Sequence, residues 1–307
     1  MAIRPPILRA GDTIGIVTLG SPRDAESIDS RIQTLQSMGF NVVVGEHVYS
    51  DDGIVAASPM ERASDLMNMF MNPDVRAIIP TRGGTGVSDI IPFLDYNIIR
   101  LNPKIITGYS DVTILLNVLY TLADLITFHS LLLIDFRPTT PAYNFNQFFT
   151  ATSTLTSPRP LENPPEMPLI SRVPGNVTGT IVGGNLSSFV DTLGTPFEVD
   201  TTGRILFIEE THEAASRVYR MIAHLIHAGK FNDCIGIIMG ECSGCYANYG
   251  KSYDDIINEV IVPLGKPLMT NLASGHGLYK MAIPIGAVTN LNTYNNTLTV
   301  LEPTVSL

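Results

Sequence analysis

Short apolar runs alternate with amphipathic stretches through the first half of the chain. In the stretch 25–38, Ile28, Ile32 and Leu35 recur at helical spacing, and a glycine follows as a helix stop. Similar patterns predict strands over 13–17, 41–44, 77–80 and 104–107, and further helices over 59–71 and 112–122. Strands that alternate with helices in this way are typical of βαβ units on a parallel sheet.

Prolines crowd the stretch 137–174, and the hydrophobic periodicity weakens there. We interpret 151–175 as a Pro-rich linker between an N-terminal α/β domain over 1–150 and a C-terminal β/α domain over 176–307. Beyond the linker the patterns predict strands over 177–182, 204–208, 234–239, 287–289 and 297–301, and helices over 215–228 and 253–262. The fold class is therefore α/β, with two domains.

Composition restricts the classes of function. The 307 residues suffice for two domains, and no apolar run approaches the roughly 18 residues of a membrane span. The first residues lack the features of a signal peptide, so we expect a soluble, cytoplasmic protein. The formal net charge of −10, without clusters of Lys or Arg, disfavours nucleic-acid and membrane partners. A small substrate fits this composition better.

Three cysteines are too few and too clustered for a disulfide framework. Cys242 and Cys245 have a CxxC spacing, but a zinc site would need a second pair of ligands, and only scattered histidines are near. We therefore expect all three cysteines, including Cys234, to be reduced and structural.

Ser110 follows an apolar strand and precedes an apolar helix without an intervening loop, in the segment Gly108-Tyr109-Ser110-Asp111. A serine on such a turn resembles a nucleophile elbow, because the helix start offers free N–H groups to an oxyanion. The second glycine of Gly-x-Ser-x-Gly is absent, since Val112 occupies its place. The alternative is that Ser110 or Asp111 only caps the helix.

A nucleophilic serine needs a base, and His276 is the leading candidate. It lies in Ser274-Gly275-His276-Gly277, where the glycines allow close approach of another segment. His129, at the end of a strand-like segment, is the competing base. We interpret the other four histidines as solvated side chains: His47, His212, His224 and His227.

A carboxylate would have to orient the histidine, and Glu209 and Glu210 both follow the buried run 204–208. Alternation along the strand does not distinguish them. The glycine-rich segment Arg82-Gly83-Gly84-Thr85-Gly86 lacks the ending of a phosphate-binding loop. Such a loop can instead present backbone N–H donors to a carbonyl oxygen.

Taken together, these segments resemble the LD-carboxypeptidase family, serine peptidases that include muramoyltetrapeptide carboxypeptidases and microcin C self-immunity hydrolases. The resemblance covers nearly the whole chain. It is carried by Arg82-Gly-Gly-Thr-Gly86 with Phe93-Leu-Asp-Tyr96, Gly108-Tyr-Ser-Asp111, Thr127-Phe-His129, Gly183-Gly-Asn-Leu-Ser187, Phe207-Ile-Glu-Glu210, and Gly275-His276 with Pro284-Ile-Gly286.

The resemblance implies Ser110 as nucleophile, His276 as general base and Glu209 as its partner. It further implies oxyanion donors at the backbone of Asp111 and Gly84, and no metal or cofactor. Asn185 is the implied substrate contact. The expected fold is a Rossmann-like or flavodoxin-like N-terminal domain and a swivelling C-terminal domain, commonly in a homodimer, with the active site between the domains.

The expected activity is removal of the terminal D-Ala of a murein tetrapeptide by cleavage of an L,D-amide bond during wall recycling. The alternative substrate is an aminoacyl-nucleotide antibiotic of the microcin C type. Thr85 stands where the family usually has Tyr, and Ser130-Leu131 where it has Gly-Pro, which leaves the substrate open. The chain has no Trp, the residue expected to stack on adenine, although Tyr or Phe can also stack. Two other classes are a non-catalytic two-domain binding module and a nucleotide-dependent enzyme.

Overall fold

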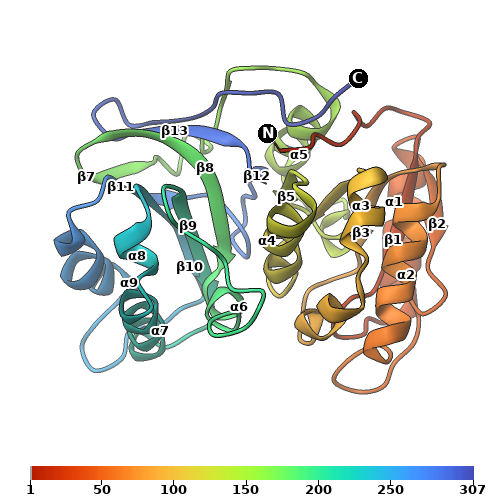
Figure 1. Cartoon of the computed structure of the whole chain (residues 1–307), viewed down its shortest axis with the longest axis horizontal. Coiled ribbons are helices and arrows are strands. Elements are labelled where there is room, and N and C mark those ends of the chain that lie inside the picture. Colours follow the sequence, from red (N-terminus) through yellow and green to blue (C-terminus); the bar gives the residue numbers. More distant parts are fainter. Residues whose placement is uncertain (1) are drawn as a thin grey trace. The chain divides into compact units, whose positions relative to one another are not determined.

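The structure is a computed structural model that describes residues 2–307, and it separates into two compact α/β units (Figure 1). Unit 1 contains the chain up to Thr156 together with Ala282–Gly286 and Pro303–Leu307. Unit 2 contains Ser157–Met281 and Ala287–Glu302. The predicted α/β class is confirmed.

Unit 1 is built on a six-stranded sheet with the order β12-β5-β4-β3-β1-β2. Its strands are β1 (Thr13–Val17), β2 (Asn41–Val44), β3 (Val75–Pro80), β4 (Ile105–Gly108), β5 (Thr127–His129) and β12 (Ile283–Ile285). The first five are parallel, and β12 pairs antiparallel with β5. The parallel strands follow the order 2-1-3-4-5, which is flavodoxin-like, so the strand order reverses between β1 and β3.

The strand order determines which face of the sheet each helix of unit 1 covers. These helices are α1 (Ala25–Ser37), α2 (Pro59–Met71), α3 (Tyr96–Leu101), α4 (Val112–Ala123) and α5 (Ala142–Ser153), with the 3₁₀ turns η1 (Val87–Phe93) and η2 (Leu133–Asp135). Right-handed crossovers place α2, α3 and α4 on one face of the sheet and α1 on the other. Accordingly, α3 contacts both α2 and α4, while α1 contacts η2.

Local sequence features explain where the predicted helices α2 and α4 begin. Ser58 and Glu61 form a capping box at the start of α2, with Pro59 at the first helical position. In α4, every residue from Val112 to Leu119 is buried, and all of β4 is buried as well. The turn that joins β4 to α4 is therefore fixed by core packing on both sides.

Unit 2 is built on an eight-stranded mixed sheet with the order β6-β14-β13-β8-β9-β10-β11-β7. Its strands are β6 (Arg159–Pro160), β7 (Ile170–Val173), β8 (Asn176–Asn185), β9 (Ile205–Thr211), β10 (Gly236–Ser243), β11 (Leu268–Leu272), β13 (Val288–Asn292) and β14 (Thr297–Val300). The four central strands β8, β9, β10 and β11 are parallel, and antiparallel strands extend the sheet at both edges. The carboxyl ends of the central strands therefore share one edge.

The helical elements of unit 2 are α6 (Leu186–Val190), α7 (Ala215–His227), α8 (Lys230–Asp233), α9 (Tyr253–Ile256), the π-helical turn η3 (Ile257–Ile261) and the 3₁₀ turn η4 (Val262–Leu264). The helix α7 buries Val218, Ile222 and Leu225 along one face, as the amphipathic pattern predicts. The helix predicted over 253–262 begins as α9 and then changes to a π turn and a 3₁₀ turn. Pro263 lacks an N–H and cannot continue an α-helical ladder there.

The stretch 151–175, interpreted above as a linker, holds more structure than its proline content suggests. It begins with the end of α5 and then contributes β6 and β7 to opposite edges of the unit 2 sheet. Strands this short leave no readable alternation, and proline is tolerated at a sheet edge. The high proline content and the short length of these segments are therefore the reason why β6 and β7 were not predicted.

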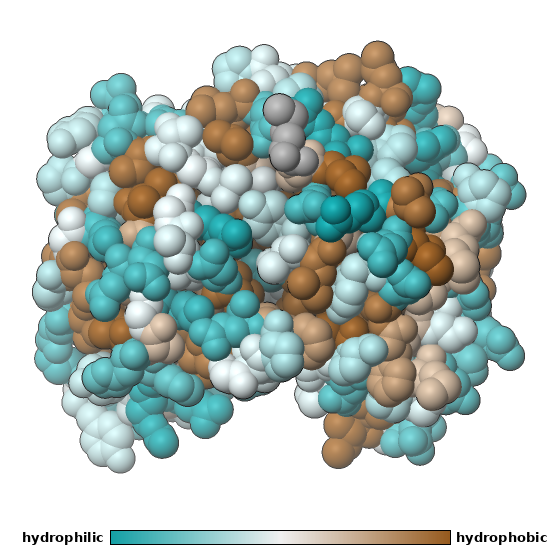
Figure 2. All heavy atoms as spheres, viewed as in Figure 1, coloured by the Kyte–Doolittle hydropathy of each residue, from teal (hydrophilic) through white to brown (hydrophobic). Residues whose placement is uncertain are grey.

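Polar side chains cover much of the face shown in Figure 2, with apolar residues interspersed among them. Across residues 2–307, the helices are all too short or too polar to cross a bilayer.

Candidate active site

Ser110 occupies the turn between β4 and α4 with a positive φ of 61°. This left-handed conformation is costly for a residue with a Cβ, and such strain concentrates at functional sites. Asp111 returns to right-handed helical angles, and α4 starts at the next residue. The turn therefore has the backbone of a nucleophile elbow, with Ser110 at its apex and the N-terminus of α4 directly behind it. The N-cap residue of α4 is Asp111, and its side chain makes no capping hydrogen bond to the helix.

The glycine-rich loop after β3 packs against this turn. A Cβ on Gly83 would lie 2.7 Å from the Cβ of Ser110 and 2.9 Å from its Oγ, so only glycine permits the observed approach. Asp111 holds the far side of the loop, because its Oδ2 accepts a hydrogen bond from the Val87 N–H at 2.8 Å. Gly84, the predicted oxyanion donor, packs against Ser21, with φ +91°. Of the two glycines, Gly83 is the one that contacts Ser110.

The loops after β1 and β3 also meet each other, at the point where the strand order reverses. A Cβ on Gly20 would lie 2.6 Å from the carbonyl oxygen of Gly83. Open α/β sheets bind ligands beyond the carboxyl ends of their strands at this point. The elbow of Ser110 follows the neighbouring strand β4, so it opens at the same edge.

In unit 2, the structure brings together two of the predicted residues from the carboxyl ends of β9 and β11. His276 Nδ1 lies 3.1 Å from Oε2 of Glu209. The Glu209 side chain is fully buried, whereas the His276 side chain is 20% exposed. A Cβ on Gly275 would lie 2.2 Å from Glu209 Oε2, which explains the glycine before the histidine. A buried carboxylate in this position can orient the imidazole and stabilise its charged form.

Glu210 has a different set of partners, which distinguishes the two glutamates. Its carboxylate accepts hydrogen bonds from Asn185 Nδ2 at 3.0 Å, from the Thr211 N–H at 2.8 Å, and from both the N–H and Oγ of Ser187. Burial raises the pKa of Glu210, these hydrogen bonds lower it, and the charge of Glu209 raises it. Glu210 therefore anchors the start of α6, and Glu209 is the glutamate next to the histidine.

Asn185 lies at the carboxyl end of β8, as expected, but its amide has structural contacts. Its Nδ2 donates to Glu210, and its Oδ1 accepts from the N–H and Oγ of Ser188 at the first turn of α6. The residue is 4% exposed. The described contacts make Asn185 the N-cap of α6, and a contact with substrate remains a prediction.

The other histidines have environments that differ from that of His276. His129, the competing base, lies in β5 and is fully buried in unit 1. His47 contacts the buried carboxylate of Asp65 through Nδ1 at 3.2 Å, and this hydrogen bond raises its pKa. His224 is exposed on α7. Among the described histidines, His276 combines partial exposure with a fully buried carboxylate at its Nδ1.

A second carboxylate and a lysine, neither of them predicted from the sequence, lie around the His276 turn. A Cβ on Gly277 would lie 1.9 Å from Glu241 Oε2, and Lys280 Nζ donates to the carbonyl oxygens of Gly275 and Gly277. Burial raises the pKa of Glu241, Lys280 lowers it and Glu209 raises it. Glu241 also follows an apolar strand run, the signal that identified Glu209, and it could have been found in the same way.

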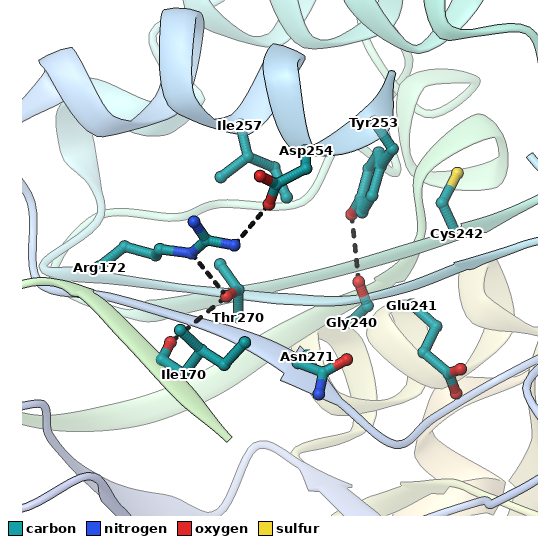
Figure 3. A pocket seen from close by; sticks show the side chains of 10 residues that line it. All are labelled: Ile170, Arg172, Gly240, Glu241, Cys242, Tyr253, Asp254, Ile257, Thr270 and Asn271. Carbon is teal, nitrogen blue, oxygen red and sulfur yellow. Dashed lines mark hydrogen bonds and ion pairs between the residues drawn. The ribbon is translucent and has the colours of Figure 1, made fainter. Parts of the chain in front are cut away.

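A pocket of about 320 Å³ lies in unit 2 next to this cluster (Figure 3). Arg172 extends between Asp254 and Thr270, and Tyr253 donates a hydrogen bond to the carbonyl oxygen of Gly240 at 3.2 Å. The carboxyl group of Glu241 points away from Arg172. Burial and the charges of Glu209 and Glu210 raise the pKa of the Tyr253 phenol. The phenol therefore stays protonated and donates.

The expectation that all cysteines are reduced is wrong for two of them. Cys242 and Cys245 form a disulfide at the end of β10, and Cys234 is free and buried. A CxxC spacing across a tight turn brings two Cα atoms within bonding range, here 5.4 Å apart. A single bridge between neighbouring cysteines needs no framework, so the low number of cysteines did not exclude it.

A flavodoxin-like unit with a strained serine elbow, and a second α/β unit with a glutamate-histidine pair, are features expected of a two-domain hydrolase. Residues 14–130 match the LD-carboxypeptidase N-terminal domain, and residues 178–291 match the LD-carboxypeptidase C-terminal domain. The chain is 35% identical to a probable murein peptide carboxypeptidase of Bacillus subtilis, over 99% of this chain and 95% of that protein.

It is also 27% identical to the microcin C7 self-immunity protein MccF of Escherichia coli, over 97% of this chain and 96% of that protein. A solved structure of MccF with aspartyl sulfamoyl adenosine has the same fold, with a TM-score of 0.92 and 24% identity, over 99% of this chain and all of that one. A muramoyltetrapeptide carboxypeptidase from Oxalobacter formigenes matches with a TM-score of 0.82 and 25% identity, over 96% of this chain and all of that one. The chain belongs to the LD-carboxypeptidase family.

Proposed function

We propose that the chain is a serine L,D-carboxypeptidase that releases the terminal D-Ala of a murein tetrapeptide in cytoplasmic wall recycling. Ser110 is the nucleophile, His276 the general base and acid, and Glu209 the partner of His276. The observation that carries the proposal is the 3.1 Å contact between His276 Nδ1 and a fully buried Glu209 carboxylate. The strained elbow at Ser110 and the family membership support it.

In this mechanism Ser110 Oγ attacks the carbonyl carbon of the L,D-amide, and His276 Nε2 takes the hydroxyl proton. The tetrahedral intermediate collapses with cleavage of the C–N bond, and His276 gives the proton to the departing amine of D-Ala. Water then attacks the acyl-enzyme, assisted by the same histidine, and releases the shortened peptide and Ser110. Glu209 holds the imidazole by its Nδ1–H and stabilises its charged form throughout.

The negative oxygen of the intermediate needs donors near Ser110. The Asp111 N–H lies at the start of α4, where backbone donors and the helix dipole favour an anion. The second proposed donor is the N–H of Gly84. The approach of the preceding residue supports this assignment, since a Cβ on Gly83 would lie 2.9 Å from the Oγ of Ser110.

Two substrates compete in this proposal, a murein peptide and an aminoacyl-nucleotide. Similarity at 35% identity to a probable murein peptide carboxypeptidase favours a peptide, and the match to MccF favours an aminoacyl-nucleotide. We prefer the peptide because the chain has no Trp to stack on an adenine base. A homodimer is part of the same proposal, and light scattering after size exclusion tests it.

One experiment separates the two substrates. Wild type and Ser110→Ala are incubated with a peptide ending in L-Lys-D-Ala, with the diaminopimelate equivalent, and with an aminoacyl sulfamoyl adenosine, and the products are identified by mass spectrometry. Release of D-Ala by wild type alone supports the carboxypeptidase. Cleavage of the nucleoside compound alone would establish the rival, and full activity of Ser110→Ala would refute the serine mechanism.

A further inference from the structure

The turn that carries His276 is closed by one backbone hydrogen bond of its own, from the Gly277 N–H to the carbonyl oxygen of Ser274 at 3.2 Å. Gly275 and Gly277 lie on either side of the histidine, and Gly275 adopts a left-handed φ of +57°. Glycine has the greatest backbone freedom of any residue, so two of them leave the turn poorly determined by local conformation. Contacts from outside the turn therefore contribute to fixing the direction of the imidazole.

The ammonium group of Lys280 provides this restraint. Its Nζ donates a hydrogen bond to the carbonyl oxygen of Gly275 at 2.7 Å and another to that of Gly277 at 2.8 Å. Lys280 is 8% exposed, so its charge lies largely outside water. A buried ammonium is costly unless its donors are satisfied, and charge-assisted hydrogen bonds are stronger than neutral ones. The carbonyl groups of the residues on either side of His276 thus share one largely buried donor.

Two carboxylates enclose the same turn. Glu209 packs against Gly275 and Glu241 packs against Gly277, each so closely that neither glycine could carry a Cβ without a clash. Lys280 is the cation that offsets the negative charge on Glu241, and it opposes the effect of burial and of Glu209 on the pKa of that carboxylate. The turn is therefore held by the lysine through its carbonyls and confined by a glutamate on each side.

We propose that Lys280 is a positioning residue for His276. By fixing both carbonyls of the glycine-flanked turn, it keeps Nδ1 of the imidazole on Glu209 and leaves Nε2 as the nitrogen that exchanges the proton with Ser110 and the leaving amine. The inference rests on the proposed function for the role of His276. The positioning effect itself concerns contacts within unit 2 and can be measured without substrate.

The first test is spectroscopic. In protein labelled with ¹⁵N-histidine, the His276 resonances are assigned by their loss in His276→Gln, and the ring nitrogens report which one carries the proton. We expect the Nδ1-protonated form in wild type, as the contact with Glu209 requires. In Lys280→Met, which keeps an apolar stem but removes the ammonium, we expect a mixture of the two neutral tautomers.

The second test is kinetic. For Lys280→Met we expect kcat to fall by about tenfold to a hundredfold, because a displacement of about 1 Å in a catalytic group costs this much, while KM stays within about threefold. Lys280→Arg keeps donors and charge, so it should restore part of kcat and the Nδ1-protonated signal. A uniform loss from reduced folding would instead lower the active fraction without a change in the tautomer.

Lys230→Met is the matched control. Lys230 is 9% exposed in unit 2 and donates to the carbonyl oxygen of Val199 at 2.9 Å, with Glu198 as its ion-pair partner. This variant loses a buried ammonium of the same kind away from the His276 turn, so its tautomer signal and kcat should match those of wild type.

Four outcomes decide the proposal. A folded Lys280→Met with wild-type kcat and tautomer would overturn the proposal, and so would an equal change in Lys230→Met. If Lys280→Met does not fold, Lys280→Arg tests the proposal instead. An arginine variant that has the wild-type tautomer but no activity would contradict a positioning role. If wild type cleaves no L,D-peptide but the tautomer still depends on Lys280, the proposed function fails and the positioning role stands.

Discussion

Nδ1 of His276 lies 3.1 Å from Oε2 of Glu209, while the adjacent Glu210 binds Asn185, Ser187 and Thr211. Two consecutive glutamates on one strand thus have separate tasks. Side chains of successive strand residues point to opposite faces of a sheet, and only one face carries the histidine. This separation makes the glutamate pair a natural comparison for mutagenesis.

Glu209→Gln should lower kcat by about 10³-fold or more, because the imidazole loses the negative charge that orients it and stabilises its charged form. Glu210→Gln is the matched variant on the same strand. It weakens hydrogen bonds at the start of α6, so it should lower the free energy of unfolding with less than about a tenfold effect on kcat. Steady-state kinetics and urea unfolding of both variants check this. Equal losses of kcat would contradict the assignment.

Ser110→Gly and Ser110→Ala should both abolish catalysis but differ in stability. The left-handed φ at this position costs a residue with a Cβ roughly 1–2 kcal/mol, and glycine avoids that cost. Glycine also gives the unfolded chain more entropy, which offsets about half of the gain. We therefore expect Ser110→Gly to have a free energy of unfolding about 0.5–1 kcal/mol above that of Ser110→Ala. Denaturant titration measures it, and the reverse order would count against the strained turn.

Gly83→Ala should damage catalysis without a general loss of structure. Its new Cβ would lie 2.7 Å from the Cβ of Ser110, so either the loop or the nucleophile must move. A shift of this kind should lower kcat by about 10²-fold. Thr85→Ala is the control in the same loop, because Thr85 is exposed and its backbone N–H, not its side chain, donates to Ser21 Oγ. Kinetics of both variants, with circular dichroism to confirm folding, check the prediction.

The disulfide predicts a defined thiol count. Protein purified without reductant and unfolded in denaturant should show one reactive thiol, from Cys234, and three after reduction. The bridge closes a loop of only four residues, so loop entropy limits its contribution to stability to about 2 kcal/mol. Cys242→Ser with Cys245→Ser should therefore remain folded. Three thiols without reduction would contradict the bridge.

Lys104 makes stability depend on pH in the alkaline range. Burial, and to a lesser extent the charge of Arg76, lowers its pKa to about 8 from an ordinary value of 10.5. Between these values the unfolded chain binds more protons than the folded one, so this lysine makes the free energy of unfolding rise with pH. Lys104→Met should reduce that slope between pH 8 and 10. Urea unfolding of both proteins across this range measures the difference, and identical slopes would refute the prediction.

Much of the fold was predictable because long amphipathic or apolar runs encode it. The helix α2 carries its own capping box at Ser58 and Glu61, and α4 and β4 are apolar throughout. By contrast, β6, β7 and β12 were not predicted as strands. They have two to four residues each, and they exist because distant segments supply their hydrogen-bond partners. Local patterns do not contain that information.

The site residues also divide into those with a local sequence pattern and those whose role depends on distant contacts. Ser110 and His276 have local signatures, a strand-to-helix turn and flanking glycines, and the structure shows why each neighbouring glycine is needed. The choice between Glu209 and Glu210 had no local signature, because both are buried and acidic. Lys280 was missed for a related reason, since its importance comes from two carbonyls that its side chain meets only in the folded turn.

The edge strand β12 limits where the chain can be cut to express unit 1 as a separate fragment. It completes the unit 1 sheet beside β5, yet it is encoded more than a hundred residues after α5. A fragment ending at residue 156 would leave the backbone groups of β5 without that neighbour, and an open edge of this kind invites pairing between molecules. Expression of the nucleophile half by itself should therefore yield aggregates, because the strand that covers this edge and the last residues of unit 1 lie outside the fragment.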